Sequence, residues 1–510
     1  MNAPETVPAF ADTHTGKLEG TRRGGVSVFK GIPFATALRW HAPEAVAPWS
    51  GVRSARAPGP VAPQNPTPLE GLIGGAGKTV QAEDCLSLNV FTPDCDGAKR
   101  PVMVWIHGGA FVTGAGSLGL YSGRALAATG DVVIVTINYR LGSLGFLRLA
   151  DVTGGRIQST GAEGLADQIA ALRWVRDNIA NFGGDPANVT IFGESAGAMS
   201  VASLLASPKA RGLFHKAISQ SGSAHIARPR EHGTRVAEAF LRHLGVSAND
   251  PAALERAPVE ALLKAQADVL AEVDTQHDPH KLGTMAFQPV IDGDVLTAWP
   301  IEAVRSGSAS GVALMAGTTT EEWKLWTALD ARFHTMDEAK LARWAERTFG
   351  EAGASLLAAD RDGTPYERYV SMQTDRAFRE PTLRLLAAQG AKAPVYEYVF
   401  DWRSPAMGGA FGACHALELG FVFGSYSLPG ADKFFGTGPE ADAINRAMMQ
   451  TWTSFARTGR PVADGVEAWP AWSAASPAAM VFGADSRAAH VTKFELPKAW
   501  AALPDRLVGP

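Results

Sequence analysis

Residues 188–205 decide the fold, and they read NVTIFGESAGAMSVASLL. The stretch begins at 188–192 with an apolar run that favours a buried strand. It passes through a Gly-x-Ser-x-Gly turn centred on Ser195 and continues into 196–205, a run compatible with a helix. A strand, a tight turn and a helix in this order favour a serine that is strained at the turn and exposed for reaction. The alternative is that Ser195 is an ordinary N-cap residue.

Glycines flank this serine at the two positions where a side chain would be in the way. Gly193 and Gly197 lack a Cβ, so the strand and the helix can approach each other closely around the turn. The helix that begins at Ala196 also places the positive end of its dipole under the hydroxyl. The pattern therefore indicates a nucleophilic serine, which needs a base and an acid that orients the base.

Apolar runs of strand length alternate with helical patterns on both sides of this stretch. Between the runs at 132–139 and 188–192, apolar residues recur at helical spacing over 165–182, and the Gly-Gly-Asp-Pro sequence at 183–186 ends that helix. Continuous apolar strands joined by helices predict an α/β fold with a large, mostly parallel central sheet flanked by helices. Further strand candidates lie at 102–106, 217–221, 312–317 and 395–400, and the last long helix is expected at 441–457.

Two stretches with weaker core patterns, about 250–282 and 330–386, read as helical insertions. We expect a single α/β domain over 1–510, in which these insertions form a cap that shapes a pocket over the carboxyl ends of the strands. The alternative is a helical elaboration that makes no contact with the substrate.

The composition excludes several classes of protein. The 510 residues are 46% hydrophobic and 19% charged, which excludes a disordered chain or a coiled coil. A net charge of −4 without a basic block argues against a nucleic-acid partner. The longest apolar runs, such as 132–137, are too short to cross a bilayer, so no membrane partner is expected.

The number of cysteines and the sequence of residues 1–15 indicate in which cellular compartment the protein is expected. Three cysteines, an odd number, cannot form a disulfide framework, and the absence of metal-ligand spacing argues against structural zinc. Residues 1–15 contain no basic start followed by an apolar stretch, as a secretory signal would. We therefore expect a cytoplasmic protein, whose oligomeric state the sequence does not indicate.

Candidates for the base and the acid lie late in the chain. In folds with this kind of turn the chain order is serine, acid, histidine. His415 follows the strand candidate at 395–400 and is the candidate base. Glu321 and Glu322 follow the strand candidate at 312–317, and because they are adjacent, at most one of them points at the base. Spacing alone does not choose between them, and each of these residues could also be an ordinary surface or core residue.

A glycine-rich turn follows the strand candidate at 102–106. Its His107-Gly108-Gly109 sequence is typical of loops whose backbone N–H groups stabilise the oxyanion of an acyl-transfer intermediate. Glycine matters there because a Cβ would obstruct the approach of the backbone. The N–H of Ala196 would complete the set of donors, and the alternative is a plain β-turn.

These segments together resemble the type-B carboxylesterase family of the α/β-hydrolase fold, which includes cholinesterases and bacterial para-nitrobenzyl esterases. The match runs from about Gly16 to Phe482. Its blocks lie at 29–33, 83–90, 138–142, 182–186, 192–197, 212–215, 289–293 and 455–459. The resemblance implies a serine carboxylesterase that hydrolyses small-molecule carboxylic esters through an acyl-enzyme intermediate, with no metal and no organic cofactor.

The resemblance also assigns roles that spacing leaves open. The family's acid follows a strand-end glycine after four residues, which matches Gly317 and makes Glu322 the orienting acid. Its histidine lies in a Gly-x-x-His-x-x-Glu motif, which matches His415. The residues implied are Ser195, Glu322 and His415 as catalytic triad, Gly108, Gly109 and Ala196 as oxyanion hole, and Ser221 beside the acid.

Several positions depart from the family pattern, among them the partner expected for Cys85 and the residue after the acid. Many members pair the cysteine that matches Cys85 with one in a segment that reads GPVAPQ at 59–64 here, so Cys85 is expected as a free, buried thiol. The residue after the acid is usually glycine but is Trp323 here, which would narrow the pocket or turn aside. Aromatic residues near the motifs are expected to line an apolar pocket or to belong to the core: Phe111, Trp323, Trp326, Phe421 and Phe423.

Two other functions stay open at this point. The natural bond could be a carbamate or an activated amide, which the same triad can attack. Some members of the family are non-catalytic adhesion proteins that have lost the nucleophile or the base. The presence of Ser195, Glu322 and His415 argues against that second alternative.

Overall fold

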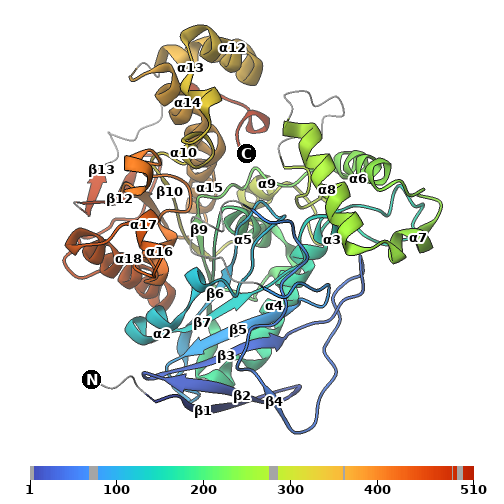
Figure 1. The fold of residues 1–510 in the computed structure, drawn as a ribbon. Helices are drawn as coiled ribbons and strands as arrows, with labels where there is room; N and C mark the ends of the chain where they lie inside the picture. The colour runs from blue at the N-terminus through green and yellow to red at the C-terminus, as the bar shows by residue number, and fades with distance from the viewer. Residues whose placement is uncertain (1–4, 68–78, 275–284, 360–361, 485, 491–497) are drawn as a thin grey trace.

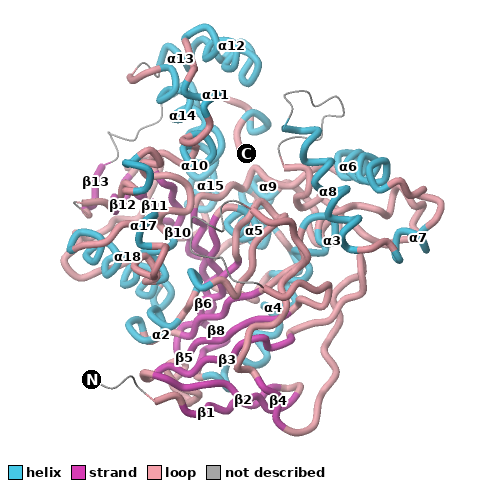
Figure 2. Tube along the Cα trace, in the orientation of Figure 1, coloured by secondary structure: helices cyan, strands magenta, loops and turns pink. Residues whose placement is uncertain are grey.

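The computed structural model describes residues 5–67, 79–274, 285–359, 362–484, 486–490 and 498–510. Within them, 13 strands form one sheet, drawn in magenta in Figure 2, with helices around it. The strand order is β1-β2-β3-β5-β7-β6-β8-β9-β10-β11-β12-β13, and β4 pairs with β2. The predicted α/β fold class is confirmed.

The longest strand, β8, lies in the centre of the sheet. The bounds of the strands are β1 Val7–Thr13, β2 Gly16–Arg23, β3 Val26–Pro33, β4 Val52–Ser54, β5 Ser87–Thr92, β6 Arg100–Ile106, β7 Val133–Ile137, β8 Gly184–Glu194, β9 Lys216–Gln220, β10 Ala313–Thr319, β11 Val395–Phe400, β12 Ala478–Phe482 and β13 Arg487–His490.

The helices range from single turns to the long α18. Their bounds are α2 Arg124–Gly130, α3 Gly142–Gly145, α4 Glu163–Asn178, α5 Ala196–Ala206, α6 Arg230–Leu244, α7 Pro251–Arg256, α8 Val259–Asp274, α9 Pro300–Arg305, α10 Lys324–Thr327, α11 Ala331–His334, α12 Glu338–Phe349, α13 Gly353–Ala359, α14 Pro365–Thr374, α15 Glu380–Gly390, α16 Leu419–Phe423, α17 Asp432–Phe435, α18 Pro439–Thr458 and α19 Lys498–Ala501.

The centre of the sheet is parallel and its edges are antiparallel. Parallel pairing runs from β7 through β6, β8, β9, β10 and β11 to β12. The strands β1, β2, β3, β5 and β7 pair antiparallel, as do β12 and β13. Because the central strands are parallel, their carboxyl ends share one edge of the sheet. The segments that carry the candidate site residues follow β6, β8, β9, β10 and β11 at that edge.

Helices cover both faces of the sheet, which explains why its central strands are mostly apolar and buried. On one face α4, α5, α9 and α15 enclose the larger hydrophobic core, and on the other α2, α16 and α18 enclose a second core. The helix predicted at 165–182 is realised as α4 and a short 3-10 turn, and the helix predicted at 441–457 as α18.

The two predicted insertions are helical where they are described. The first contains α7 and α8, and its residues 275–282 lie outside the described residues. The second contains α11 to α15, and its residues 360–361 lie outside them. Figure 1 shows α6 to α8 as one helical group at the side of the molecule and α12 to α14 as another beyond the sheet.

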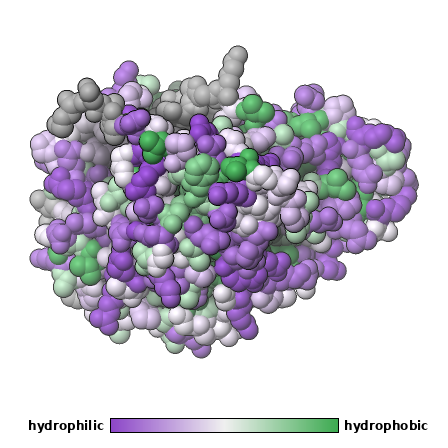
Figure 3. Space-filling view, turned by 90° about the horizontal axis from the view of Figure 1, so that it is seen from below, coloured by the Kyte–Doolittle hydropathy of each residue, from purple (hydrophilic) through white to green (hydrophobic). Residues whose placement is uncertain are grey.

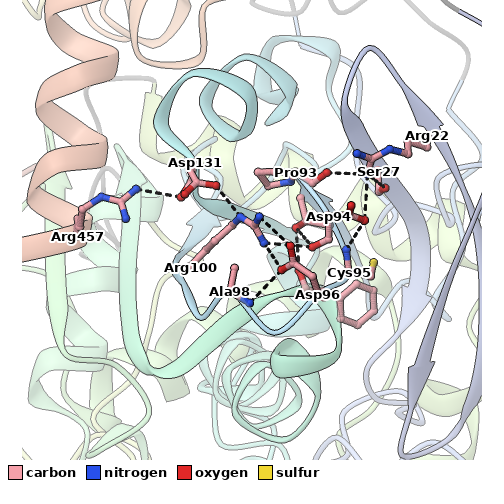
Figure 4. A network of polar contacts seen from close by, with 12 residues as sticks. Arg22, Ser27, Pro93, Asp94, Cys95, Asp96, Ala98, Arg100, Asp131 and Arg457 are labelled. Carbon is pink, nitrogen blue, oxygen red and sulfur yellow. Dashed lines mark hydrogen bonds and ion pairs between the residues drawn. The ribbon is translucent and has the colours of Figure 1, made fainter.

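A polar network joins the loops at the amino ends of the parallel strands, opposite the candidate site (Figure 4). Arg100 at the start of β6 pairs with Asp96 at 2.5 Å and with Asp131 at 2.6 Å. Arg457 at the end of α18 donates to the backbone carbonyl of Asp131 at 3.1 Å. The network therefore ties α18 to the sheet and has no contact with the candidate site.

One face of the surface and the helices bear on whether the chain could cross a membrane. On the face seen in Figure 3, hydrophilic residues predominate and hydrophobic residues form small groups. In the part of the chain that the structure describes, no helix combines the length and the apolar character that crossing a bilayer requires.

Candidate active site

Ser195 lies at the sharp turn between β8 and α5. Its backbone has φ 56° and ψ −124°, a strained conformation for a residue with a side chain, and its N–H donates to the carbonyl of Gln220 at 2.9 Å. A Cβ on Gly197 would collide with the carbonyl oxygen of Ile106, and one on Gly193 would collide with the backbone of Gly197. The two glycines therefore allow β8 and α5 to approach each other closely, as expected from the sequence.

His415 and Glu322 are brought together although 93 residues separate them. The Nδ1 atom of His415 lies 2.6 Å from Oε2 of Glu322, and both side chains are buried. The other carboxylate oxygen, Oε1, accepts from the hydroxyl of Ser221 at 2.6 Å and from the N–H of Thr319 at 2.8 Å. Because both oxygens of Glu322 are held, the carboxylate fixes the orientation of the imidazole ring.

Glu321, the alternative acid, faces the other way. Its carboxylate accepts from the N–H of Ala413 at 2.9 Å and pairs with Lys324 at 2.6 Å and Arg403 at 3.0 Å. None of these partners belongs to the candidate triad. The geometry therefore favours Glu322 over its neighbour, a choice that spacing alone leaves open.

The loop after β6 packs directly against the serine. A Cβ on Gly108 would lie 3.1 Å from the Cβ of Ser195, and one on Gly109 would collide with the backbone of Thr113. The hydroxyl of Tyr139 donates to the carbonyl of His107 at 2.7 Å, and the two rings stack with centroids 4.4 Å apart. Burial lowers the pKa of His107 to about 4, so this ring is neutral near pH 7 and serves as a support for the loop.

One further carboxyl group contacts the imidazole, and a second interacts electrostatically with it. The Nε2 atom of His415 lies 2.9 Å from Oε1 of Glu194, the residue before Ser195. Glu418 is fully buried, accepts from the side-chain amide of Gln220 at 3.2 Å, and has its pKa raised to about 8 by burial. Burial also raises the pKa of Glu194 above its usual range. Burial acts to lower the pKa of His415, but Glu194 and Glu322 outweigh it and raise this pKa well above its usual range.

These charges predict how activity depends on pH. Only the neutral imidazole accepts a proton, so a raised pKa moves the acidic limb of kcat/KM to higher pH. Replacing Glu194 with Gln removes one negative charge beside His415, and we expect the midpoint of that limb to fall by about 1 pH unit or more. The measurement is kcat/KM against pH for both enzymes, with Glu321→Gln as control. An unchanged or raised midpoint would contradict the electrostatic account.

Three aromatic residues form a wall beside the imidazole, and we call Trp323, Trp326 and Phe378 the aromatic wall. The rings of Trp326 and Phe378 lie 4.9 Å and 4.8 Å from the ring of His415, and they stack on each other at 6.1 Å. Trp323 lies 5.0 Å from Trp326. Trp326 is 47% exposed whereas His415 is only 4% exposed, so the wall reaches from the surface to the imidazole.

The other aromatic candidates belong to the core. Phe111 is buried and packs edge-on against Phe146 at 4.9 Å. Phe421 and Phe423 are buried in the core under α16 and α18, where Phe423 contacts Trp105 at 5.0 Å. Of the five aromatic residues named from the sequence, the structure brings Trp326 to His415, places Trp323 against Trp326, and leaves these three in the interior.

Sequence reasoning named neither Glu194 nor Phe378 as a site residue. Glu194 stands inside the serine motif, so its position next to the nucleophile was available as a signal. Phe378 lies in a π-helical turn, η5 (Asp375–Arg379), which no motif marks. π-Helical turns are rare and occur often at functional sites, but they are visible only in a structure.

The structure places the three cysteines and shows how they are protonated. All three cysteines are described and free, and Cys85 is buried as expected. Burial raises the pKa of Cys85 to about 12, so it stays a thiol. Among the described residues, no group of three or more His, Cys, Asp or Glu side chains could hold a metal ion.

Comparison with known proteins places this geometry in a family. The Carboxylesterase family matches residues 8–497. The chain belongs to the carboxylesterase family. It is 41% identical to a para-nitrobenzyl esterase of Bacillus subtilis (strain 168) over 468 residues, which cover 90% of this chain and 92% of that protein. It is 38% identical to a phenmedipham hydrolase of Pseudarthrobacter oxydans, over 93% of this chain and 95% of that protein.

Solved structures of carboxylesterases share the fold. A Geobacillus stearothermophilus carboxylesterase superimposes with a TM-score of 0.86 at 40% identity, covering 96% of this chain and 100% of that one. A structure named PNB esterase gives a TM-score of 0.83 at 37% identity, covering 96% and 99%. The fold is therefore the α/β-hydrolase fold of this family, and this carboxylesterase is a carboxylic ester hydrolase.

Proposed function

We propose that this carboxylesterase hydrolyses small-molecule esters through an acyl-enzyme formed on Ser195, with His415 as base and Glu322 as the acid that orients it. The observation that carries the proposal is the 2.6 Å contact between Nδ1 of His415 and Oε2 of Glu322, with Nε2 facing the turn that bears Ser195. A Glu bound at Nδ1 directs Nε2, the atom that exchanges a proton with the hydroxyl, toward the serine turn, where it lies 2.9 Å from Oε1 of Glu194 in this structure.

The reaction follows from these positions. The hydroxyl oxygen of Ser195 attacks the ester carbonyl carbon while His415 takes the hydroxyl proton. When the tetrahedral intermediate collapses, the bond to the alcohol oxygen breaks and the alcohol leaves with the proton from His415. Water then attacks the acyl-enzyme in the same way, which releases the carboxylic acid and restores the serine.

Backbone N–H groups would stabilise the oxyanion in both steps. We assign this role to Gly108, Gly109 and Ala196. The packing of Gly108 against Ser195 supports the assignment, as does the position of Ala196 at the start of α5. One such donor contributes about 3 kcal/mol to transition-state stabilisation in other hydrolases. Ser221 holds the second oxygen of Glu322 and so acts on the base through the acid.

The aromatic wall defines the substrate class further. An apolar wall that continues from the surface to the base favours an ester with a flat or apolar group next to the scissile bond. Phe378 comes from the insertion at 330–386, which supports a pocket-shaping role for this part of a single domain. The para-nitrobenzyl esterase and the solved carboxylesterase are named for esters, and these names favour ester hydrolysis over the carbamate or amide alternative. The cytoplasmic location stays a prediction.

The wall itself can be tested by Phe378→Ala. We expect KM for phenyl acetate or methyl benzoate to rise by about tenfold, because a buried aromatic face is lost, whereas methyl acetate is affected much less. Phe333→Ala is the matched control, since Phe333 stacks on Tyr369 at 5.4 Å in the same insertion. Equal losses with all three esters would show that Phe378 contributes to folding and not to substrate binding.

The nucleophile can be located directly. The protein is incubated with a fluorophosphonate, digested and examined by mass spectrometry, and the adduct is expected on the peptide that contains Ser195. A panel of esters varied in acyl length and in alcohol size is assayed in parallel. An adduct on another residue, or an absence of hydrolysis across the panel, would refute the proposed function.

A further inference from the structure

Residues 498–510, which we call the strap, pack against α14 and α15, the helices on either side of the π-helical turn that carries Phe378. In Figure 1 the red end of the chain lies close to α14 and α15. Within the strap, Trp500 is 1% exposed and meets Phe349 of α12 edge-on at 5.5 Å. Leu503 and Val508 complete this hydrophobic cluster together with Met372 of α14. The strap is therefore packed as part of the helical insertion.

Charged groups hold the strap at a second point. Asp505 accepts from Arg384 of α15 at 2.7 Å and from Arg305 of α9 at 2.5 Å, and it lies 2.9 Å from Nε2 of His225. The guanidinium of Arg384 also donates to the carbonyls of Trp500 at 3.1 Å and Leu503 at 2.8 Å. One carboxylate thus ties the strap to α9, to α15 and to the loop that follows β9.

The third contact reaches the π-helical turn itself. The N–H of Gly509 donates to the carbonyl of Arg376 at 2.7 Å, and the guanidinium of Arg376 donates to the carbonyl of Gly509 at 2.9 Å. Arg376 stands two residues before Phe378. Its Nε also donates to the side chain of Gln373 at 2.9 Å, which links the turn to α14. A π-helical turn has poorer internal hydrogen bonding than an α-helix, so outside partners help to maintain it.

The helices α14 and α15 also contact other segments of the candidate site. Thr374, the last residue of α14, accepts from the N–H of Trp323 at 3.3 Å. Thr382 of α15 donates to the carbonyl of Gly222 at 3.3 Å, next to Ser221. Gly509 sits with φ +99°, and a Cβ there would lie 2.9 Å from the Cβ of His225. The strap therefore touches both the turn that carries Phe378 and the loop that begins at Ser221.

We propose that the strap is a positioning element, which holds the π-helical turn so that the aromatic wall stands against His415 and sets the binding of aromatic esters. This inference rests on the proposed function, because it concerns the pocket of the same site. No strap residue is needed for the chemical step. Loosening the strap should therefore weaken the binding of substrates that use the wall and leave the turnover of small esters nearly unchanged.

The test uses Gly509→Val in the full chain. The substitution strains the backbone and crowds His225, and we expect KM for the aromatic ester that depends on Phe378 to rise about threefold to tenfold. KM and kcat for methyl acetate should change by less than about twofold. Gly430→Val is the matched control, since Gly430 has φ +92° and no atom within 4 Å of an added Cβ. Asp505→Asn is a second variant, which loosens the strap by removing a negative charge and leaves the size of the side chain nearly unchanged.

Hydrogen exchange provides a readout that does not depend on activity. We expect amides of 374–379 to exchange faster in Gly509→Val and Asp505→Asn than in the wild type, with the sheet unaffected. Unchanged exchange at 374–379, an equal loss with all esters, or the same effects in Gly430→Val would overturn the inference. If the wild type hydrolysed no ester, the proposed function would fail, and the exchange data would still report whether the strap holds the turn.

Discussion

Ser195→Ala is expected to lower kcat/KM by about 10⁴- to 10⁶-fold, because the acyl group then has no oxygen to which it can be transferred. The residual rate would come from the backbone donors and from substrate binding, which the substitution leaves in place. The measurement is steady-state hydrolysis of an activated ester, together with circular dichroism to show that the fold is retained.

Ser203→Ala is the matched control for this result. Ser203 lies on α5, the helix that Ser195 precedes, it is buried, and its hydroxyl donates to the carbonyl of Met199 at 2.9 Å. Its removal should leave activity close to that of the wild type. A Ser195→Ala enzyme that kept more than about a tenth of the activity would refute the assignment of the nucleophile.

Glu322→Gln is expected to lower kcat by about 10³- to 10⁴-fold with little effect on folding. An amide facing Nδ1 can donate a hydrogen bond, which favours the imidazole tautomer with its proton on Nε2. That tautomer cannot accept the proton of Ser195. The measurement is kcat for a series of esters at the pH optimum of each enzyme.

Glu321→Gln tests whether the acid was assigned to the correct neighbour. Glu321 pairs with Lys324 and Arg403 and makes no contact with His415. Because partly exposed ion pairs contribute at most about 1 kcal/mol, we expect kcat within about threefold of the wild type. If Glu321→Gln were the inactive enzyme and Glu322→Gln the active one, the roles would be reversed.

Local patterns were sufficient to predict the main elements of the fold. The apolar runs at 102–106, 132–139 and 395–400 correspond to β6, β7 and β11, because strands buried on both faces are rich in apolar residues on both faces. The serine turn was equally visible, since its glycines are required by contacts between β8, α5 and the end of β6. The apolar strands and the serine turn depend on which residue types stand next to one another in the chain. They can therefore be predicted from a single sequence.

The choice between Glu321 and Glu322 could not be predicted from local sequence patterns. Adjacent residues have the same spacing to every motif, and only the resemblance to a family preferred one of them. In the structure the choice follows from side-chain direction after β10: one carboxylate meets Ser221, Thr319 and His415, and the other meets surface cations. Direction is a property of the folded backbone and has no signature in composition or periodicity.

By itself, the sequence determined the α/β class, the serine turn, the glycine loop after β6 and a short set of candidate acids and bases, because each depends on residue type at short spacing. Only the tertiary structure decided that Glu194 contacts the imidazole, that Phe378 stands beside it in a π-helical turn, and that the strap pairs with Arg376. These contacts join segments tens to hundreds of residues apart. Their geometry is set by how the helices pack over the sheet, which no local stretch of chain encodes.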